Sequence, residues 1–220
     1  MSFLYDCKGN RKYLTASERR DFVTAAHALP DAAERTFCSI LVYTGMRLSE
    51  GLALTHGQID FDDCVVVIRS LKKRRDGIFR AVPLPSALLA ALDATHGVRA
   101  AQTSCERRDE RLWPWCRTVG WQTVKRAMRA ARIDGVQATP KGLRHGFAVG
   151  ALQNGVPINI VSRWLGHANL RTTAIYAEAV GAEERSFAQR MWSAFKFDPP
   201  SNDGGASFPD TETEDLSSPY

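Results

Sequence analysis

The sequence contains no long apolar run and few cysteines. No stretch approaches the roughly 18 apolar residues that a helix needs to span a bilayer, and residues 1–6 lack the apolar core of a secretory signal peptide. The five cysteines, at positions 7, 38, 64, 105 and 116, are odd in number and never spaced as CxxC. These absences argue against a membrane protein, a disulfide framework and a structural zinc site. We expect reduced thiols, no bound metal and a cytoplasmic location.

Acidic residues are scarce in the body of the chain. The 220 residues include 29 Lys and Arg and 24 Asp and Glu, but six of the acids and none of the bases lie from Asp198 onward. Residues 1–197 therefore carry a formal charge of +11, against +5 for the whole chain. A body this basic suits a polyanionic partner, most often a nucleic acid. Charge alone does not identify the partner, because many basic proteins bind nothing specific.

The hydrophobic pattern predicts a mostly helical domain. Thr15 and Glu18 form a capping box that begins a helix reaching about Leu29. Helical spacing, caps and stop signals predict further helices at about 32–43, 47–54, 87–94, 118–132, 140–153, 157–164, 170–177 and 182–195. Residues 1–12 read as an arm, residues 99–112 as a loop, and the Pro-, Gly-, Ser- and acid-rich residues 198–220 as a disordered tail.

Three short segments have the composition of strands, at residues 58–61, 64–71 and 78–84. Asp62 and Asp63 predict a turn between the first two. Asp76-Gly77 predicts a hairpin between the last two, because both residue types tolerate positive φ. The expected fold class is therefore mainly α, with one small three-stranded antiparallel sheet.

Four short motifs lie on separate segments of this framework. They are TGMRLSE at 44–50, AVPL at 81–84 behind a basic hairpin, KGLRHGFA at 141–148, and WLGH at 164–167 with a tyrosine nine residues after the histidine. In this order they resemble the motifs of the tyrosine recombinase (phage integrase) family, over about residues 14–195. The resemblance implies the catalytic-domain fold of DNA breaking-rejoining enzymes. It also implies site-specific DNA cleavage and rejoining through a 3′-phosphotyrosine, without metal, ATP or another cofactor.

Two arginines are the implied phosphate clamps. Arg47 and Arg144 stand at the family's two arginine positions, and a guanidinium is always charged and bonds two phosphate oxygens at once. Outside these motifs each would be read as an ordinary surface or paired arginine. Glu50, one helical turn after Arg47, either orients it or makes a simple i,i+3 pair, and we favour the supporting role.

Two lysine positions carry the implied proton chemistry. Lys72, in the basic hairpin, matches the family's leaving-group acid best, and Lys73 is the alternative because this hairpin is longer than the common pattern. Lys141 stands where the family usually has histidine. A lysine exchanges protons near neutral pH only if burial or nearby cations lower its pKa. We therefore expect Lys141 to act electrostatically or as a donor to the phosphate, and proton transfer to fall mainly to Lys72.

The last motif supplies the implied nucleophile. His167 follows a glycine at a helix break, and it is expected to bond a phosphate oxygen in the transition state, with Trp164 packed beneath it. Tyr176 is the implied nucleophile, which needs a neutralised phosphate in line with its hydroxyl because a free tyrosine has a pKa near 10. His145 is expected to point away from Arg144, either as a packing residue or as one that supports a catalytic side chain.

The remaining basic residues are expected to contact the DNA backbone, which sets affinity more than base readout. They are Lys73, Arg74 and Arg75 in the hairpin and Lys125, Arg126 and Arg129 on the helix at 118–132. Two other functions remain open. One is a catalytically idle protein that occupies recombination sites, and the other is strand passage of the type IB topoisomerase kind.

The resemblance also predicts organisation and partners. Residues 1–12 would be an arm, 13–197 the catalytic domain and 198–220 an acidic disordered tail, without the N-terminal core-binding domain that completes a DNA clamp in many relatives. The chain is in this respect similar to minimal members such as fimbrial phase-variation recombinases, unless a partner supplies the clamp or the chain is a remnant. We expect double-stranded DNA as partner, a homotetramer on two synapsed sites, a monomer or dimer off DNA, and nucleoid association in a prokaryote. The apolar face at 182–195 serves either exchange between subunits or packing on its own domain.

Overall fold

The computed structural model describes residues 4–70, 78–167, 169–176 and 191–192. The chain divides into two compact units, residues 1–183 and 184–220. Of the second unit the structure describes only Met191 and Trp192, which are helical and exposed. The predicted tail and most of the predicted last helix lie outside the described residues. The rest of the fold concerns the first unit.

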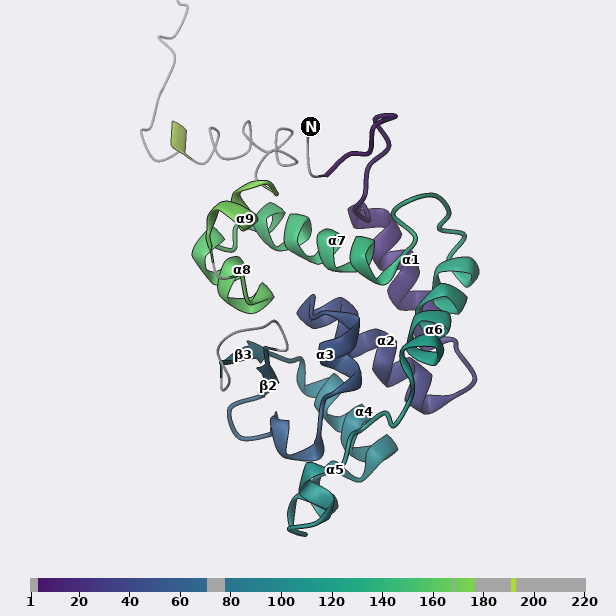
Figure 1. Cartoon of the computed structure of the whole chain (residues 1–220), viewed down its shortest axis with the longest axis vertical. Coiled ribbons are helices and arrows are strands. Elements are labelled where there is room, and N and C mark those ends of the chain that lie inside the picture. The colour runs from purple at the N-terminus through teal and green to yellow at the C-terminus, as the bar shows by residue number, and fades with distance from the viewer. Residues whose placement is uncertain (1–3, 71–77, 168, 177–190, 193–220) are drawn as a thin grey trace, which may run out of the picture. The chain divides into compact units, whose positions relative to one another are not determined.

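The first unit is mainly helical, as predicted (Figure 1). Its α-helices are α1 (Ala16–His27), α2 (Ala32–Thr44), α3 (Leu48–Leu52), α4 (Ser86–His96), α5 (Val98–Gln102), α6 (Arg117–Ala130), α7 (Pro140–Gln153), α8 (Ile158–Leu165) and α9 (Arg171–Ala174), with short 3₁₀ turns η1 (His56–Gln58) and η2 (Arg107–Asp109). Within the part of the chain that the structure describes, no helix is long and apolar enough to cross a bilayer.

The helix boundaries follow local capping chemistry. Thr15 accepts a hydrogen bond from the Glu18 backbone N–H at 3.2 Å, and Glu18 accepts one from the Thr15 N–H at 2.8 Å, so the predicted capping box is present. Thr139 caps α7 by accepting a hydrogen bond from the Gly142 backbone N–H at 3.0 Å, with Pro140 at the first helical position. Gly45 ends α2 with φ +61°, and Gly166 ends α8 with φ +64°, a left-handed conformation that suits glycine.

The sheet is antiparallel, with strand order β1 (Ile59–Asp60), β2 (Val65–Arg69) and β3 (Phe79–Pro83). Val66 pairs with Ile59 on one side and with Val82 on the other. All three strands are shorter than predicted, and the first has only two residues because residues 56–58 form the η1 turn. Its predicted hairpin at Asp76-Gly77 lies outside the described residues.

The predicted loop at 99–112 is wrong in part. Val98–Gln102 forms α5 and Arg107–Asp109 forms η2. Val98 and Ala101 are fully buried, and the Gln102 side chain donates to the carbonyls of His56 and Ile59 at 2.8 and 2.7 Å. These tertiary contacts order a segment whose polar composition indicates a loop.

Two hydrophobic clusters stabilise the unit. The larger joins α1 to α6 and the sheet, and Trp113 at its centre packs edge-on against Phe37 at 5.2 Å while its Nε1 donates to the Ala33 carbonyl. The second cluster joins α7, α8 and the residues after α9, through Leu4, Ala148, Val149, Val161, Leu165 and Tyr176.

The second cluster includes part of the predicted N-terminal arm. Leu4 is fully buried in it, although residues 1–12 show no regular apolar pattern. Arg11 anchors the arm further by a two-pronged bond to Glu18 in α1. The arm therefore packs against α7 and α8 instead of only preceding the domain.

Candidate active site

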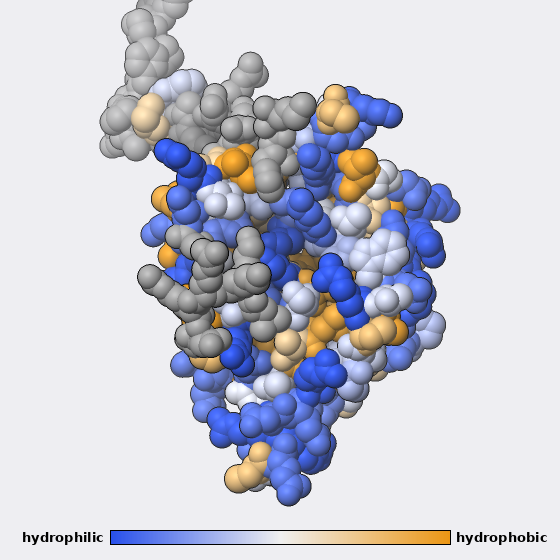
Figure 2. All heavy atoms as spheres, viewed as in Figure 1, coloured by the Kyte–Doolittle hydropathy of each residue, from blue (hydrophilic) through white to orange (hydrophobic). Residues whose placement is uncertain are grey.

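A cleft of about 1430 Å³ lies where α3, α7 and the sheet approach one another. Its walls come from the start of α3, β3, the start of α6, the exposed face of α7 and the residues after α8 and α9. Seven of its described lining residues are basic, and Asp6 is the one acid among them; the basic residues are Lys12, Arg47, Arg80, Arg117, Lys141, Arg144 and Arg163. Figure 2 shows the hydrophilic side chains that dominate this face, around a hollow with apolar residues at its floor. This charge suits a polyanion.

Arg47 lies at the mouth of the cleft, directly before α3. The left-handed turn at Gly45 ends α2 and brings Arg47 to the cleft. Its Nη1 donates to Glu50 Oε1 at 2.8 Å and its backbone N–H to Glu50 Oε2 at 2.9 Å. The side chain is 28% exposed, so it is oriented by Glu50 and still reaches solvent.

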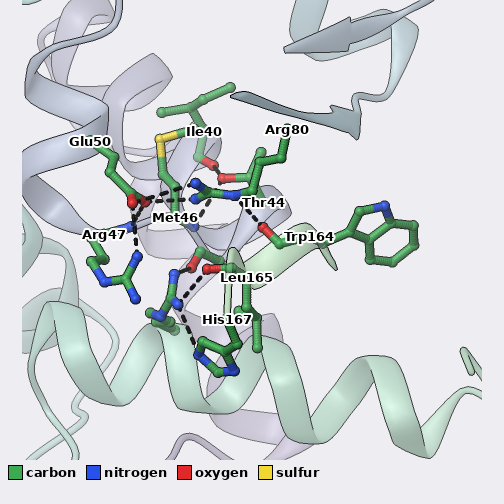
Figure 3. A network of polar contacts seen from close by, with 11 residues as sticks. Ile40, Thr44, Met46, Arg47, Glu50, Arg80, Trp164, Leu165 and His167 are labelled. Atoms are coloured by element: carbon green, nitrogen blue, oxygen red, sulfur yellow. Dashed lines mark hydrogen bonds and ion pairs between the residues drawn. The ribbon is translucent and has the colours of Figure 1, made fainter. Parts of the chain in front are cut away.

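Glu50 is shared between Arg47 and a second arginine that the sequence reading missed. Arg80 of β3 donates from Nη2 to Glu50 Oε2 at 2.6 Å, and both side chains are almost fully buried. Figure 3 shows Arg47 and Arg80 approaching the carboxylate from two sides. Burial alone raises the pKa of Glu50, but hydrogen bonds and charges from Arg80 and Arg47 outweigh it and hold the pKa below its ordinary value. The carboxylate is therefore ionised and pairs with Arg47, and its supporting role in catalysis stays a prediction.

Arg80 connects this pair to the opposite wall. Its Nε donates to the Trp164 carbonyl oxygen at 2.7 Å, and its guanidinium packs against Gly166. Figure 3 shows this carbonyl facing Arg80. One side chain therefore joins the α3 segment of the Arg47 motif to the segment that carries His167.

We expect Glu50→Gln to destabilise the fold by about 3 kcal/mol, because it leaves the buried Arg80 guanidinium without a counter-charge. Denaturant unfolding at pH 7 measures this. The low pKa of Glu50 means that its stabilisation is present above the ordinary carboxyl pKa and is lost as pH falls through the folded-state pKa. The difference between the two proteins should therefore narrow in acid.

A matched control is Glu34→Gln, which breaks the ion pair with Arg126 on the protein surface. The Arg126 side chain is 46% exposed, so the expected change is below about 1 kcal/mol. Adding Arg80→Met to Glu50→Gln should recover part of the loss, since it removes the unpaired charge. Equal, small effects of both Glu→Gln changes would contradict a stabilising role for the buried pair.

Arg144 lies at the centre of the site and is 7% exposed. Its Nη1 donates to the Gly45 carbonyl and its Nη2 to the Leu165 carbonyl, both at 2.7 Å, and Nη2 lies 3.1 Å from His167 Nε2. Burial, followed by repulsion from Arg47, lowers the pKa of Arg144 to about 10, so it stays charged at neutral pH. A guanidinium has five N–H donors, so these contacts leave donors for a phosphate.

His167 is held by groups on both ring nitrogens. Nδ1 lies 2.8 Å from Thr173 Oγ1 in α9, and Nε2 lies next to Arg144. Figure 3 shows the His167 ring at the end of the same polar network. The ring lines the cleft, so the structure brings His167 and both implied arginine clamps to one place.

Tyr176 lines the same cleft but is buried. It is 2% exposed, and its ring lies nearly parallel to the His167 ring, at 13° and 6.3 Å between centroids. Burial raises the pKa of its hydroxyl, and the charges of Arg144 and Arg47 offset only part of that increase. Its Oη is 2.7 Å from Nδ1 of His145.

His145 does not point away from the site, as expected, but of its two expected roles the structure favours support of the implied nucleophile over plain packing. Lys141, Arg144 and His145 follow one another at i, i+3 and i+4 on α7, so all three line the cleft. His145 is 4% exposed and contacts the implied nucleophile. The helical spacing was readable in the sequence, but its contact with Tyr176 depends on the packing of α9 beside α7.

The expected place of Trp164 is also wrong. Its indole contacts Phe147, with ring centroids 6.3 Å apart, and in Figure 3 it points away from the polar network. The ring stacked on His167 is that of Tyr176. The part of Trp164 that supports the site is its backbone carbonyl, which accepts from Arg80.

None of the described residues that we expect to contact the DNA backbone lines the cleft, and their contact with DNA stays a prediction. Residues 72–75, including Lys72, Lys73, Arg74 and Arg75, lie outside the described residues. On α6, Lys125 donates to the Ala138 carbonyl and Arg126 pairs with Glu34, and neither these residues nor Arg129 line the cleft. Arg117 and Trp121, at the start of α6, line it instead. Within the described part of the chain, no group of three or more His, Cys, Asp or Glu is placed to hold a metal.

Comparison with known proteins identifies the family of this chain. Residues 12–182 match the family model described as the phage integrase family. The chain belongs to that family. A curated relative, the tyrosine recombinase XerA of Thermococcus onnurineus, is 33% identical over 172 residues, which cover 76% of this chain and 58% of the relative. The chain spans a little over half the length of the first curated relatives that it matches.

Solved structures of the phage integrase family share the fold. A crystal structure of XerA recombinase matches with a TM-score of 0.64 and 25% identity, over 85% of this chain and 66% of that one. A crystal structure of XerH site-specific recombinase bound to its difH substrate matches with a TM-score of 0.63 and 21% identity, over 79% and 56%. The predicted fold class, the catalytic-domain fold of tyrosine recombinases, is confirmed.

Proposed function

We propose that this chain is a site-specific DNA recombinase that cleaves and rejoins DNA through a 3′-phosphotyrosine on Tyr176. One observation carries the proposal: Arg47, Arg144, His167 and Tyr176 come from four separate segments and meet at one basic cleft. Three of the four are polar groups suited to the non-bridging oxygens of a phosphodiester, and the fourth is a nucleophile beside them.

The proposed reaction is a transfer of the phosphoryl group. Tyr176 Oη loses its proton and attacks the phosphorus, the bond from phosphorus to the 5′-oxygen breaks, and the 5′-oxygen takes a proton from Lys72 of the predicted hairpin, or from Lys73. Arg47 and Arg144 neutralise the non-bridging oxygens as charge develops. His167 donates a hydrogen bond to one of them when its Nε2, which lies beside Arg144 without DNA, is protonated and turns to the phosphate. The phosphodiester energy is kept in the tyrosine ester, so rejoining is the reverse reaction and consumes no ATP.

The burial of Tyr176 adds a step. At 2% exposure its hydroxyl does not meet solvent, so a DNA phosphate reaches it only if the second cluster opens. We propose that DNA binding in the cleft drives this opening. The cost is the loss of apolar contacts that cover Tyr176, while its hydroxyl keeps the hydrogen bond to His145.

Double-stranded DNA is the proposed partner. The seven basic residues lining the cleft support it, and XerH, with the same fold, is solved on a DNA substrate. A homotetramer on two synapsed sites and an accessory or clamp protein stay predictions. The experiment for the proposed function is covalent trapping on nicked suicide DNA, with DNA flanking the gene as the substrate pool and a denaturing gel as readout.

A shifted, nuclease-sensitive band is the expected result, because the nick lets the short cleaved strand leave and prevents rejoining. A chain that binds this DNA tightly and forms no band would instead fit a catalytically idle occupant of recombination sites. Relaxation of supercoiled DNA that carries no flanking sequence would favour strand passage of the topoisomerase kind.

Lys141 provides a separate prediction. It is exposed, lines the cleft and lies one turn before Arg144 and His145, so we propose an electrostatic or donor role toward the phosphate. Lys141→Ala is expected to slow adduct formation by about 10- to 100-fold. The ratio of the wild-type rate to the variant rate should be the same at every pH. Lys141→His should retain more of the rate than alanine, because an imidazole also donates. Normal recombination by Lys141→Ala would exclude this role.

A further inference from the structure

His145 contacts the reacting atom of the proposed reaction, the Tyr176 hydroxyl oxygen. It is not one of the four residues that carry the proposed function. Its Nδ1 lies 2.7 Å from Tyr176 Oη, and both side chains are buried. The Tyr176 ring is held between two imidazoles: it stacks on His167 and is tilted by 49° to His145, at 5.5 Å between centroids. We propose that His145 positions the Tyr176 hydroxyl and accepts its proton as the phosphate is attacked. This inference rests on the proposed function.

The proton needs an acceptor inside the protein. Burial raises the pKa of Tyr176 above its ordinary value, so the phenolate is scarce at neutral pH and the proton must leave during the attack. His167 is poorly placed to take it, because its Nδ1 is bonded to Thr173 and its Nε2 contacts Arg144. His145 is already within hydrogen-bond distance of the hydroxyl.

His145 is in the right protonation state to accept. Burial, then the charges of Lys141 and Arg144 on its own helix, His167 after α8 and Lys12 before α1, lower the pKa of His145 to about 4. Its ring is therefore neutral at pH 7, and with the proton on Nε2 the Nδ1 atom accepts. A DNA phosphate among these cations offsets their repulsion and raises the affinity of His145 for a proton. The base therefore strengthens as substrate arrives.

The proton balance of the step is complete. The bond from Tyr176 Oη to phosphorus forms, the bond from phosphorus to the 5′-oxygen breaks, and the hydroxyl proton moves to Nδ1 of His145. The leaving oxygen takes a different proton, from Lys72 or Lys73 as proposed above. On rejoining, His145 returns its proton to Tyr176, and the attacking 5′-hydroxyl gives its proton back to the lysine.

The test compares His145→Asn with the wild-type chain. The measurement is the single-turnover rate of adduct formation on suicide DNA, at saturating DNA and from about pH 6 to 9. Asparagine places an amide near the position of Nδ1, so it keeps a hydrogen bond to the hydroxyl but takes up no proton. We expect unchanged DNA affinity and a rate lower by about 100-fold or more at pH 7. The ratio of the wild-type rate to the variant rate should fall by about tenfold for each unit of rising pH, because hydroxide replaces the missing base. The wild-type rate should not change with pH over this range.

A second DNA substrate distinguishes the loss of the proposed base, His145, from the loss of the proposed acid, Lys72. With sulfur in place of the bridging 5′-oxygen the leaving group departs without a proton, so this DNA should rescue Lys72→Ala but leave His145→Asn slow. The matched control is His27→Asn at the exposed end of α1, which should behave as wild type. Rescue of His145→Asn by sulfur would overturn the proposal.

The other outcomes are equally decisive. A wild-type rate in His145→Asn, or a deficit that is the same at every pH, overturns proton transfer to His145 while the proposed function stands. No adduct from the wild-type chain rejects the proposed function itself. If His145→Asn binds DNA poorly, His145→Ala with added imidazole replaces it: a rate that rises with unprotonated imidazole supports the proposal, and retained DNA binding without rescue refutes it.

Discussion

Tyr176→Phe is expected to abolish the covalent complex with suicide DNA completely. The change removes the single atom that would bond phosphorus and keeps the ring that packs in the second cluster. The fold should survive, because the loss is one buried hydrogen bond to His145, worth about 1 kcal/mol. DNA affinity should be unchanged or slightly higher. Measurement of adduct on a denaturing gel, beside equilibrium DNA binding, separates chemistry from binding.

The matched control is Tyr43→Phe, which makes the same change in α2 at a side chain that is 39% exposed. It should form adduct at the wild-type rate. An adduct that persists in Tyr176→Phe would mean that another residue is the nucleophile. Since the wild-type band is required in the same gel, a failed substrate and a wrong nucleophile give different results.

Arg144→Lys is the second large expected effect, with adduct formation slower by about 10³-fold or more. Arg144 has two functions that lysine cannot combine. Its fork bonds the carbonyls of Gly45 and Leu165, on either side of the cleft, while it contacts His167. A lysine ammonium is a compact charge without that planar fork, so the variant loses a phosphate clamp and the ordering of His167 together. Loss of one such preorganised donor typically costs about 10²–10³ in rate.

The rate for Arg144→Lys is measured at saturating DNA, so that weaker binding does not enter. Arg99→Lys is the control, because Arg99 is exposed on α5 and lies over the Phe61 ring away from the cleft lining. It should react as wild type. A rate for Arg144→Lys within tenfold of wild type would show that charge alone is sufficient and that the fork is unimportant.

Several elements were predictable because their signals are local. The capping box of Thr15 and Glu18, Thr139 with Pro140, and the glycines that end α2 and α8 all act within one helical turn. The three strands follow from β-branched composition and turn residues, although the pattern overestimated their lengths. The loop predicted at 99–112 failed because its order comes from contacts with η1, which lie more than 40 residues away in sequence.

The residues of the site also divide into those that a local motif identifies and those that only distant contacts position. Arg47, Glu50, Lys141, Arg144, His167 and Tyr176 were identified from short motifs, and the structure places all of them at or beside one cleft. Arg80 was missed although it directly precedes the AVPL motif, because nothing local indicates that an arginine on a strand is buried. Trp164 was misplaced because a motif gives the order of residues but not the direction in which an indole points.

The helical class, the small sheet, the membership in the phage integrase family and the order of the motif residues could all be derived from the amino-acid sequence. Those properties depend on residue types at fixed short spacings. Two contacts became known only from the folded chain: Arg80 joins Glu50, 30 residues away, to the Trp164 carbonyl, 84 residues away, and His145 holds Tyr176. The physical reason is that buried polar groups must find partners wherever packing brings segments together, and that choice is made by the whole core rather than by neighbours in the chain.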